Sequence, residues 1–547
     1  MIKKLLAVTL CCGMILSVSL SPGAAEIENA AAGAHADAAV VAADYAEVGG
    51  TLEPTGALPS AYSSADEGFT TPVRSQKYNT CWAYSSTASL ESLLLKNRYA
   101  SQHLSTMHMN YWGCTNSNGN GWQRDYNAAG YPYIALGYLT SFGCIPDSDF
   151  DESRTIYDYT SLNDSLFPYQ IADGVIYLKT ADRDTIKTAI YTYGGVVGNF
   201  HYDAAAWNTE TSAYYYDTPG LTTSQLNGHA IEIVGWDDNY TASNFVEGHQ
   251  PSAAGAWLCK NSWGSGWGLN GYFWISYEDC YLFDSRFGPS YAISSCTAAS
   301  TLGKMKQNEI YGATYEFSYI QQLKPNLTKM TYANVFDFSD GYHKIKEVVF
   351  ESTSEGSSYT VYYIPVDDSG APVTDTSRWM LLAQGTVDYQ GYICANTYGF
   401  TPTDQKGAIG IQIEKNSTNT SDITIGVGEW LTTGGRYLFK PDSSYGQSYL
   451  IGYTANAMDV MDFYKNSLED NVGGTFVIKA YCTADDKDGD VDRDGSFTII
   501  DVTLVQRYLA NLISLNDEQL RFADFNNDNH VDSIDVTLMQ RRLAHIS

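Results

Sequence analysis

Three side chains of different chemistry stand in a fixed order along the first half of this chain. Cys81 lies within Thr-Cys-Trp-Ala-Tyr-Ser, His229 within Asn-Gly-His-Ala-Ile, and Asn261 within Lys-Asn-Ser-Trp-Gly. In this order a thiol, an imidazole and an amide can form a nucleophile, its base and the group that orients the base. A fold that uses all three must bring distant segments to one point.

These segments resemble those of the papain family of cysteine peptidases. His229 lies 148 positions after Cys81, and Asn261 lies 180 positions after it, which is longer than the usual spacing and indicates a loop insertion. Leu58 and the proline after it resemble the mature start of such enzymes. The resemblance implies an α+β papain-like catalytic domain over residues 58–290, acting on a polypeptide substrate without a cofactor.

The resemblance also assigns roles near the nucleophile. Gln76 is expected to donate to the oxyanion together with the backbone N–H of Cys81, although one residue fewer than usual separates the two positions. Tyr78 replaces a cysteine of the family pattern. The segment Ala-Ala-Gly-Tyr-Pro that contains Gly130 resembles the family's Asn-Gly-Gly-Tyr-Pro, with alanine in place of the first glycine. Gly130 is therefore expected to pair its backbone with the substrate chain.

Local sequence patterns predict how the three side chains are presented. Residues 82–95 have apolar side chains at helical spacing and no glycine or proline, so Cys81 is expected to open a buried helix whose dipole favours a thiolate–imidazolium pair. The run after His229 alternates as a strand does, and residues 257–261 predict a partner strand that ends at Asn261.

Each motif taken singly has a structural explanation, such as a buried thiol, a structural histidine or a turn. Their common order favours catalysis. A catalytically inactive papain-like binding protein is the main alternative, and labelling by an epoxide-type reagent at Cys81 would distinguish the two. A transglutaminase-like acyltransferase usually pairs its cysteine and histidine with an aspartate, so the context of Asn261 disfavours it.

A second signal lies at the other end of the chain, where an acidic twelve-residue loop occurs twice. Oxygen-bearing side chains at alternating positions are typical of an EF-hand-like calcium site, although both loops end in aspartate instead of glutamate. The predicted ligands are Asp490, Asp492, Asp494, Ser496, Thr498 and Asp501 in the first loop, and Asp524, Asn526, Asp528, His530, Asp532 and Asp535 in the second.

Nearly the same helix follows each loop, and no helix is expected before either loop. Residues 486–547 therefore resemble a type I dockerin, a small α calcium-binding module with structural calcium. The resemblance implies a cohesin of a scaffoldin as partner. The expected contacts are Thr503, Gln506, Arg507, Thr537, Gln540 and Arg541. Ile499-Ile500 and Ser533-Ile534 differ, so the two faces are not expected to be equivalent.

Between these parts, residues 300–482 show short alternating apolar runs separated by Ser, Thr, Gly and Asp, a pattern typical of an all-β sandwich. This region is similar to the lectin-like domain of some bacterial papain-like proteases, which makes carbohydrate a candidate ligand. Most of its aromatic side chains are expected to fill the core. The chain as a whole is predicted to be multidomain, with a polar linker from Thr483 to Lys487.

The N-terminus and the composition predict an extracellular protein. Residues 1–25 have the pattern of a signal peptide, and residues 26–57 form a pro or linker segment too short for a long helical inhibitory propeptide. No other stretch is long and apolar enough to span a bilayer. The net charge of −30 argues against nucleic acid or an anionic membrane as partner. We expect secretion and attachment to a cell-surface cellulosome. Cys114 and Cys144 are a candidate disulfide.

Overall fold

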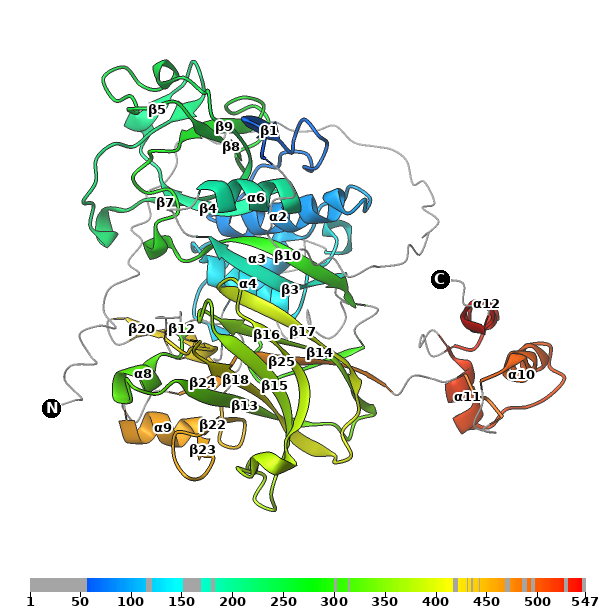
Figure 1. Cartoon of the computed structure of the whole chain (residues 1–547). Helices are drawn as coiled ribbons and strands as arrows, with labels where there is room; N and C mark the ends of the chain where they lie inside the picture. Colours follow the sequence, from blue (N-terminus) through cyan, green and yellow to red (C-terminus); the bar gives the residue numbers. More distant parts are fainter. Residues whose placement is uncertain are drawn as a thin grey trace.

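The computed structural model describes most of the chain from residue 57 onward. The described residues are 57–114, 121–150, 169–178, 183–299, 303–312, 315–416, 422–429, 431–433, 436–441, 443–467, 473–484, 489–492, 497–525 and 530–543. The predicted signal peptide and, apart from Ala57, the segment 26–57 lie outside this set. The elements form three groups in Figure 1, which we name the peptidase lobe (57–299), the β lobe (303–484) and the C-terminal module (489–543).

A buried helix occupies the centre of the peptidase lobe. This is α2 (Cys81–Lys96), which begins at Cys81 as predicted and is buried on nearly all sides along most of its length. Such all-round burial is typical of a helix enclosed by other elements. The other helices of this lobe are α3 (Thr106–Trp112), α4 (Pro132–Ser141) and α6 (Arg183–Tyr193).

One long sheet runs through the peptidase and β lobes. Its order is β11-β25-β14-β17-β3-β10-β4-β7-β8-β9-β6-β5, with β1 paired to β7. The peptidase lobe contributes β1 (Ala61–Ser63), β3 (Gln170–Leu178), β4 (Val196–His201), β5 (Trp207–Asn208), β6 (Ala213–Tyr214), β7 (Gly228–Asp237), β8 (Ala256–Lys260), β9 (Tyr272–Ser276) and β10 (Ser290–Ala298). The adjacent strands β7 and β8 confirm the two strands predicted around His229 and Asn261.

The β lobe is a sandwich of two sheets, as predicted. Its part of the long sheet consists of β11 (Lys304–Gln307), β14 (Tyr342–Ser352), β17 (Gly391–Phe400) and β25 (Ile478–Ala484). The facing sheet has the order β16-β15-β18-β13-β22-β23, with β13 (Lys329–Asp337), β15 (Ser358–Pro365), β16 (Met380–Thr386), β18 (Lys406–Glu414), β22 (Ser448–Ile451) and β23 (Met458–Asp459). Side chains of both sheets share one core, which includes Tyr332, Ile411, Val348 and Ile478.

Smaller elements complete the β lobe. They are β12 (Tyr315–Glu316), β19 (Gly426–Glu429), β20 (Leu431–Thr433), β21 (Arg436–Lys440), β24 (Gly474–Phe476), α8 (Tyr319–Leu323) and α9 (Val460–Ser467). One of them reaches the peptidase lobe, because β21 pairs with β2 (Gly121–Trp122).

The two lobes are joined strand to strand. In the long sheet, β17 of the β lobe pairs with β3 of the peptidase lobe through Gly391 opposite Ile176 and Tyr392 opposite Val175. A Cβ atom at Gly391 would lie 2.0 Å from the carbonyl oxygen of Val175, so this close approach requires glycine. Figure 1 shows β3 beside β17 at this joint.

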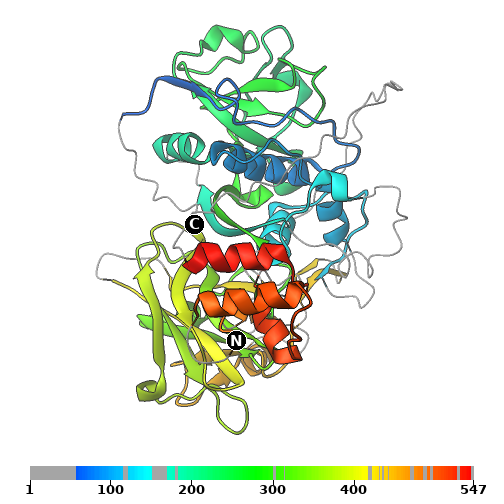
Figure 2. The same ribbon diagram turned by 90° about the vertical axis from the view of Figure 1, so that its right-hand side faces the viewer.

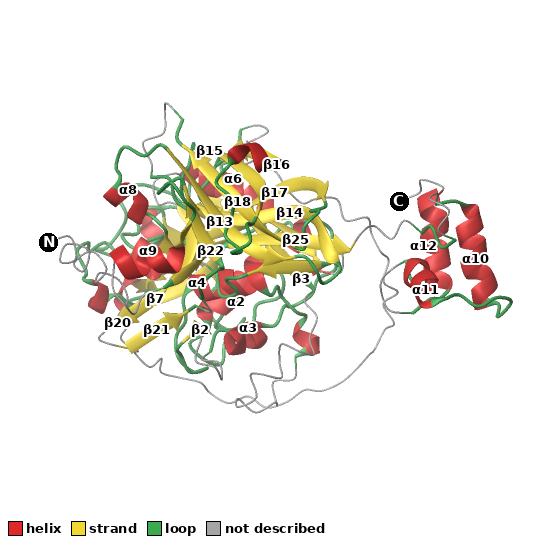
Figure 3. Cartoon of the chain, turned by 90° about the horizontal axis from the view of Figure 1, so that it is seen from below, coloured by secondary structure: helices red, strands yellow, loops and turns green. Residues whose placement is uncertain are grey.

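The C-terminal module has three helices around a small core. They are α10 (Ile499–Leu509), α11 (Asp517–Ala523) and α12 (Ser533–Leu543), and α10 and α12 lie side by side in Figure 2. Figure 3 shows the module as a group apart from the two lobes. The prediction that no helix precedes either loop is wrong for the second loop, because α11 ends at Ala523, immediately before Asp524. An Asn516–Gln519 capping box begins α11, and Phe522 anchors it in the core.

Two further predictions concern cysteines and the membrane. No disulfide joins the described cysteines, so the candidate bridge between Cys114 and Cys144 is wrong. Each thiol instead donates to a backbone carbonyl, that of Asn110 for Cys114 and that of Gln170 for Cys144. Among the described residues, no helix combines the length and the apolar character that crossing a membrane would need.

Candidate active site

The imidazole of His229 is held by an amide and covered by an indole. His229 Nε2 lies 2.8 Å from Asn261 Oδ1, and both side chains are buried. Since an amide oxygen only accepts hydrogen bonds, Nε2 carries the proton and Nδ1 is left as the basic nitrogen. The ring of Trp263 stacks on the imidazole at a centroid distance of 4.5 Å and shields this bond from water.

The thiol of Cys81 is placed where the predicted helix begins. The backbone N–H groups of Ala230, Trp82 and Cys81 itself act on the thiol electrostatically and favour its ionised form, that is, they lower its pKa. Ala230 is the neighbour of His229 on β7, so the N-terminus of α2 presents the thiol to the histidine-bearing strand. The structure thus places His229 in contact with Asn261 and packs α2, which begins at Cys81, against the strand that carries His229.

Burial acts against charge at both reacting groups. Burial raises the pKa of the Cys81 thiol, although the three backbone N–H groups oppose this. Burial also lowers the pKa of His229 to about 4, although the bond to Asn261 raises it. A thiolate–imidazolium pair would need the direct attraction of the two charges to offset this burial. That pair therefore stays a prediction.

Gln76 is fixed beside the triad segment. Its backbone N–H donates to the carbonyl oxygen of Ser262, and its Oε1 accepts a hydrogen bond of 2.6 Å from the Ser262 hydroxyl. Its Nε2 donates to the carbonyl oxygen of Tyr78 at 2.8 Å, which engages one of the two amide protons. The other N–H of this amide is the predicted hydrogen-bond donor to an oxyanion. Ser262 thus fixes the Gln76 amide, a contact that the motif analysis did not single out.

Gly130 lies against the indole that follows the nucleophile. A Cβ atom at Gly130 would lie 2.3 Å from the ring of Trp82, so only glycine fits there. The guanidinium of Arg124 lies over the same indole at 5.2 Å. It donates to the carbonyl oxygens of Ala128 and Ala129, at 2.6 and 3.3 Å, just before Gly130.

Arg124 also ties this segment to the end of α3. Its guanidinium donates to the backbone oxygen of Asn110 at 3.2 Å, to Oδ1 of the same residue at 2.8 Å, and to the Gly113 oxygen at 3.3 Å. Sequence reasoning missed this residue because a single arginine in a polar loop carries no motif. Its contacts depend on a turn that only the fold reveals.

A buried ionic network lies behind the predicted catalytic residues. Glu91 of α2 binds Arg74 at 3.1 Å, and Lys260 of β8 lies 3.4 Å from Glu232 of β7. The Lys260 ammonium also donates to Thr71, whose hydroxyl donates to Glu91. Both carboxylates are about 1% exposed, so this network neutralises charges that would otherwise be costly to bury.

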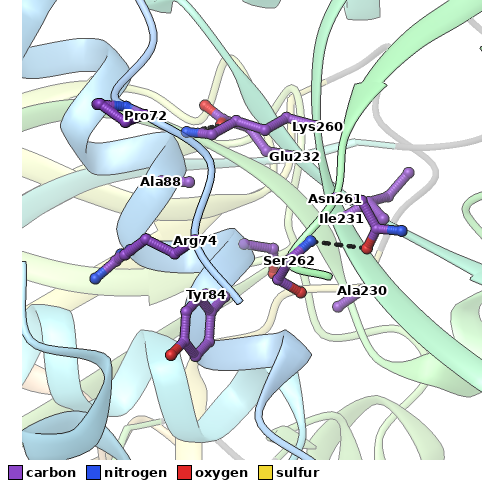
Figure 4. Close-up of a pocket in the computed structure, with 11 residues that line it drawn as sticks. Pro72, Arg74, Tyr84, Ala88, Ala230, Ile231, Glu232, Lys260, Asn261 and Ser262 are labelled. Carbon is purple, nitrogen blue, oxygen red and sulfur yellow. Dashed lines mark hydrogen bonds and ion pairs between the residues drawn. The ribbon is translucent and has the colours of Figure 1, made fainter. Parts of the chain in front are cut away.

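The network connects the segments that carry the predicted catalytic side chains. Figure 4 shows Glu232 beside Lys260, and Arg74 on the segment that leads toward Gln76. Lys260 immediately precedes Asn261, whose Oδ1 accepts the N–H of Ser262 at 2.8 Å. The cavity drawn there has a volume of about 20 Å³, which is room for about one water molecule.

In the C-terminal module the first loop brings predicted calcium ligands together. Carboxylate oxygens of Asp490, Asp492 and Asp501 lie within 4.8 Å of one another. Asp501 Oδ1 accepts the backbone N–H groups of Val491 and Asp492, at 2.7 and 3.1 Å, which fixes the loop around it. The Thr498 side chain caps α10 by accepting a hydrogen bond from the backbone N–H of Ile500. This donor set fits a hard divalent cation.

The second loop repeats part of this arrangement. The Asp535 carboxylate accepts hydrogen bonds from the backbone N–H groups of Phe525 and Asp532, at 2.6 and 2.8 Å. Asp524, the first predicted ligand of this loop, is buried. His530 is exposed. The remaining predicted ligands, Asp494, Ser496, Asn526 and Asp528, lie outside the described residues.

Comparison with known families agrees with this division of the chain. Residues 58–289 match the model of the papain family cysteine protease, residues 310–482 match that of the lectin-like domain, and residues 488–544 match that of the dockerin type I domain. Among curated proteins, rat cathepsin Q is 27% identical over 224 residues and human cathepsin L2 is 26% identical over 223 residues. These alignments cover 40% of this chain and only 59% and 61% of the relatives.

Two solved structures extend the similarity over both lobes. The clostridial cysteine protease Cwp84 after propeptide cleavage is 32% identical, covers 77% of this chain and 99% of its own, and has a TM-score of 0.67. The cysteine protease and lectin-like domains of Cwp84, a surface layer associated protein of Clostridium difficile, are 31% identical with the same TM-score. This second comparison covers 79% of this chain and 90% of the other.

Proposed function

Because this chain belongs to the papain family of cysteine proteases and carries a lectin-like domain and a type I dockerin, we propose that it is a secreted peptidase displayed on a cellulosome-type scaffold. The observation that carries the catalytic part is the bond from His229 to Asn261 beneath Trp263, with the thiol of Cys81 on the adjacent helix start. An inactive binding protein would have no use for this tautomer control.

The first half of the reaction forms an acyl-enzyme. His229 Nδ1 takes the proton of the Cys81 thiol, and the sulfur forms a bond to the peptide carbonyl carbon. The oxygen gains the negative charge and is stabilised by the Cys81 N–H and by the second amide proton of Gln76. The C–N bond then breaks, and His229 returns the proton to the leaving amine.

The second half releases the acid product. His229 takes a proton from water, and the resulting hydroxide attacks the thioester carbonyl. The C–S bond breaks, and the imidazolium gives its proton back to the sulfur of Cys81. Asn261 keeps the ring in one orientation through both halves.

Gly130 would position the substrate by its backbone. The indole of Trp82 and the guanidinium of Arg124 hold the segment around it, so an extended peptide can add its own hydrogen bonds to a fixed edge. The lectin-like match makes carbohydrate the proposed ligand class of the β lobe.

The C-terminal module would attach the enzyme to a cohesin. Calcium would be held by Asp490, Asp492 and Asp501 in the first loop and by Asp524 and Asp535 in the second, and it would supply positive charge among crowded carboxylates. The surface association of Cwp84 supports an extracellular location for this chain.

Labelling tests the catalytic proposal directly. The intact protein is treated with an epoxide-type thiol reagent and digested, and the modified peptide is identified by mass spectrometry. We expect modification at Cys81 with loss of peptidase activity, and none at Cys81 after His229→Ala. The exposed Cys280 is the matched control, since Cys280→Ser should leave labelling and activity unchanged. Turnover that persists after stoichiometric modification of Cys81 would refute the mechanism.

A further inference from the structure

Two carboxylates and a thiol meet at the joint between the two lobes, away from the proposed active site. They belong to Asp173 on β3, Glu347 on β14 and Cys394 on β17, and one ligand atom of each lies within 4.8 Å of the others. The strand order places β17 between β14 and β3, so the three side chains lie across adjacent strands of the long sheet. Asp173 is 3% exposed, whereas the other two are half-buried.

A buried phenol is directed toward the same group. Tyr481 on β25 lies directly opposite Glu347 on β14. Its side chain is fully buried, and its hydroxyl has no hydrogen-bond partner among the residues that the structure describes. Because directly opposite residues of paired strands point to the same face of a sheet, the phenol lies on the face that carries the Glu347 carboxylate. Burying a hydroxyl group without a hydrogen-bond partner costs free energy. The Tyr481 oxygen is therefore expected to bind a group that the described residues do not supply.

The surrounding backbone and hydroxyl groups orient the ligand set. Asp173 Oδ2 accepts a hydrogen bond of 2.5 Å from Thr297, and Oδ1 accepts one from Ser295. The β3–β10 register shifts beside Ser295, and the registers of β14 with both neighbours shift between Ile345 and Glu347. Such bulges re-aim side chains. Hydrogen bonds from outside the ligand set fix ligand orientation in metal sites.

We propose that the joint holds one zinc ion, or a divalent cation of similar softness, on Asp173, Glu347 and Cys394, with the Tyr481 hydroxyl or a water molecule in the fourth position. Zinc accepts cysteine sulfur and carboxylate oxygen together in tetrahedral sites, whereas calcium takes oxygen ligands. The thiol must lose its proton to bind, so binding releases a proton to solvent.

The ion would act as a clip between the lobes. Asp173 belongs to the peptidase lobe, whereas Glu347 and Cys394 belong to the β lobe, so coordination adds a link across the short β3–β17 pairing. The half-buried ligands leave a route for the ion from solvent. This site is independent of the peptidase reaction and of the calcium loops.

The test uses the full chain carrying Cys81→Ala, which removes the thiol of the proposed active site. Excess calcium is present to fill the dockerin loops. Cobalt is added as a spectroscopic substitute for zinc. We expect one equivalent of bound cobalt with a sulfur-to-cobalt charge-transfer band, displacement of that band by zinc, and a higher thermal midpoint with zinc. Cys394→Ser should abolish the band, and Cys280→Ser should not.

Further variants make the test decisive if one of them folds poorly. Glu347→Gln and Asp173→Asn should each weaken zinc binding at least tenfold by calorimetry, with folding checked by circular dichroism. Binding of zinc by Cys394→Ser as tightly as by the parent, or a parent that binds no zinc at all, would overturn the proposal. A parent that binds cobalt without the sulfur band would overturn it as well.

Discussion

The peptidase lobe and the C-terminal module differ in the source of the positive charge that balances their buried carboxylates. In the peptidase lobe, Glu91 and Glu232 are buried beside Arg74 and Lys260, so the chain supplies the positive charges itself. In the module, Asp490 and Asp501 are buried with carboxylate oxygens of the first loop drawn together. Calcium is proposed to supply the positive charge there.

This difference in charge balance predicts which of the two sites needs a metal ion: the proposed active site or the acidic loops of the module. Internal ion pairs hold together the elements that carry the proposed active site, because α2, β7 and β8 contribute to one large core. The module has only a small core around Val502, Phe522 and Met539, so we expect its crowded acidic loops to need an ion to become ordered. Catalysis should therefore be insensitive to metal, and partner binding should depend on it.

The largest expected effect comes from removing the nucleophile. Cys81→Ala should lower kcat by roughly 10⁶-fold, because nucleophile and base act as a unit. His229→Ala should be nearly as severe, and the two losses should not add. Steady-state assays with a peptide substrate measure both, and unchanged thermal midpoints control for folding. Wild-type turnover by Cys81→Ala would contradict the assignment.

A chelator tests whether cohesin binding and peptidase activity differ in their dependence on calcium. Calcium removal should reduce cohesin binding by at least about 100-fold, because the loops cannot order without the ion. Asp490→Ala combined with Asp524→Ala should reproduce this loss. Peptidase activity on a small substrate should persist in both cases. Surface plasmon resonance and parallel kinetics provide the two measurements. A helical signal in the isolated module that chelation leaves unchanged would argue against the calcium requirement.

An intermediate effect is expected at the oxyanion donor. Gln76→Ala should lower kcat by roughly 10²–10³-fold, as for other single oxyanion donors. Ser262→Ala should produce a smaller loss of the same kind, because it frees the Gln76 amide to rotate without deleting it. Stopped-flow acylation rates distinguish the two variants. An effect of Ser262→Ala that equals that of Gln76→Ala would mean that the serine does more than position the amide.

A smaller effect is expected where Arg124 holds the substrate segment. Arg124→Met should raise KM by roughly tenfold to a hundredfold with a smaller change in kcat, because the segment before Gly130 loses two hydrogen bonds. Arg124→Lys should recover part of the loss. Kinetics on a long peptide provide the test. The exposed Arg378 is the control, and Arg378→Met should change nothing.

The smallest effect on peptidase activity is expected at His108, which lies buried against Tyr138 and acts on the pH dependence of stability instead. Burial lowers the pKa of His108 to about 4, below its usual value of 6.5. The unfolded chain therefore binds the proton first, and the free energy of unfolding should fall as pH drops from about 6.5 to 4, by up to about 3 kcal/mol. Urea unfolding across this range measures it. His108→Gln should flatten the decline, and His249→Gln at an exposed site should not.

Sequence alone was sufficient where a residue's chemistry is tied to a local pattern. The helix that opens at Cys81, the strands at His229 and Asn261, and the sandwich strands all follow from periodicity, and the structure confirms them. The contact between Asn261 and His229 is different. Periodicity predicts the two strands, and the family resemblance of the motifs is needed to pair the two side chains.

Sequence reasoning failed where a feature depends on contacts between distant segments. The helix α11 is short and weakly patterned, and its capping box is satisfied by Asn516 and Gln519 against a core that forms only in the folded module. Arg124 and the group around Asp173 carry no spacing signal, because strands far apart in the sequence bring their partners together.

The strand pairing at Gly391 has a consequence for how this chain can be taken apart. A peptidase lobe cut near residue 300 would lose β17 and leave β3 as an open edge, ready to pair with another copy. The first two lobes should therefore be inherited and expressed as one piece. The C-terminal module shares no strand with them in the described structure, so exchanging it for another module should leave the rest intact. Recombination should therefore be tolerated at the boundary between the β lobe and the C-terminal module, and it should disrupt the fold at the boundary between the peptidase lobe and the β lobe.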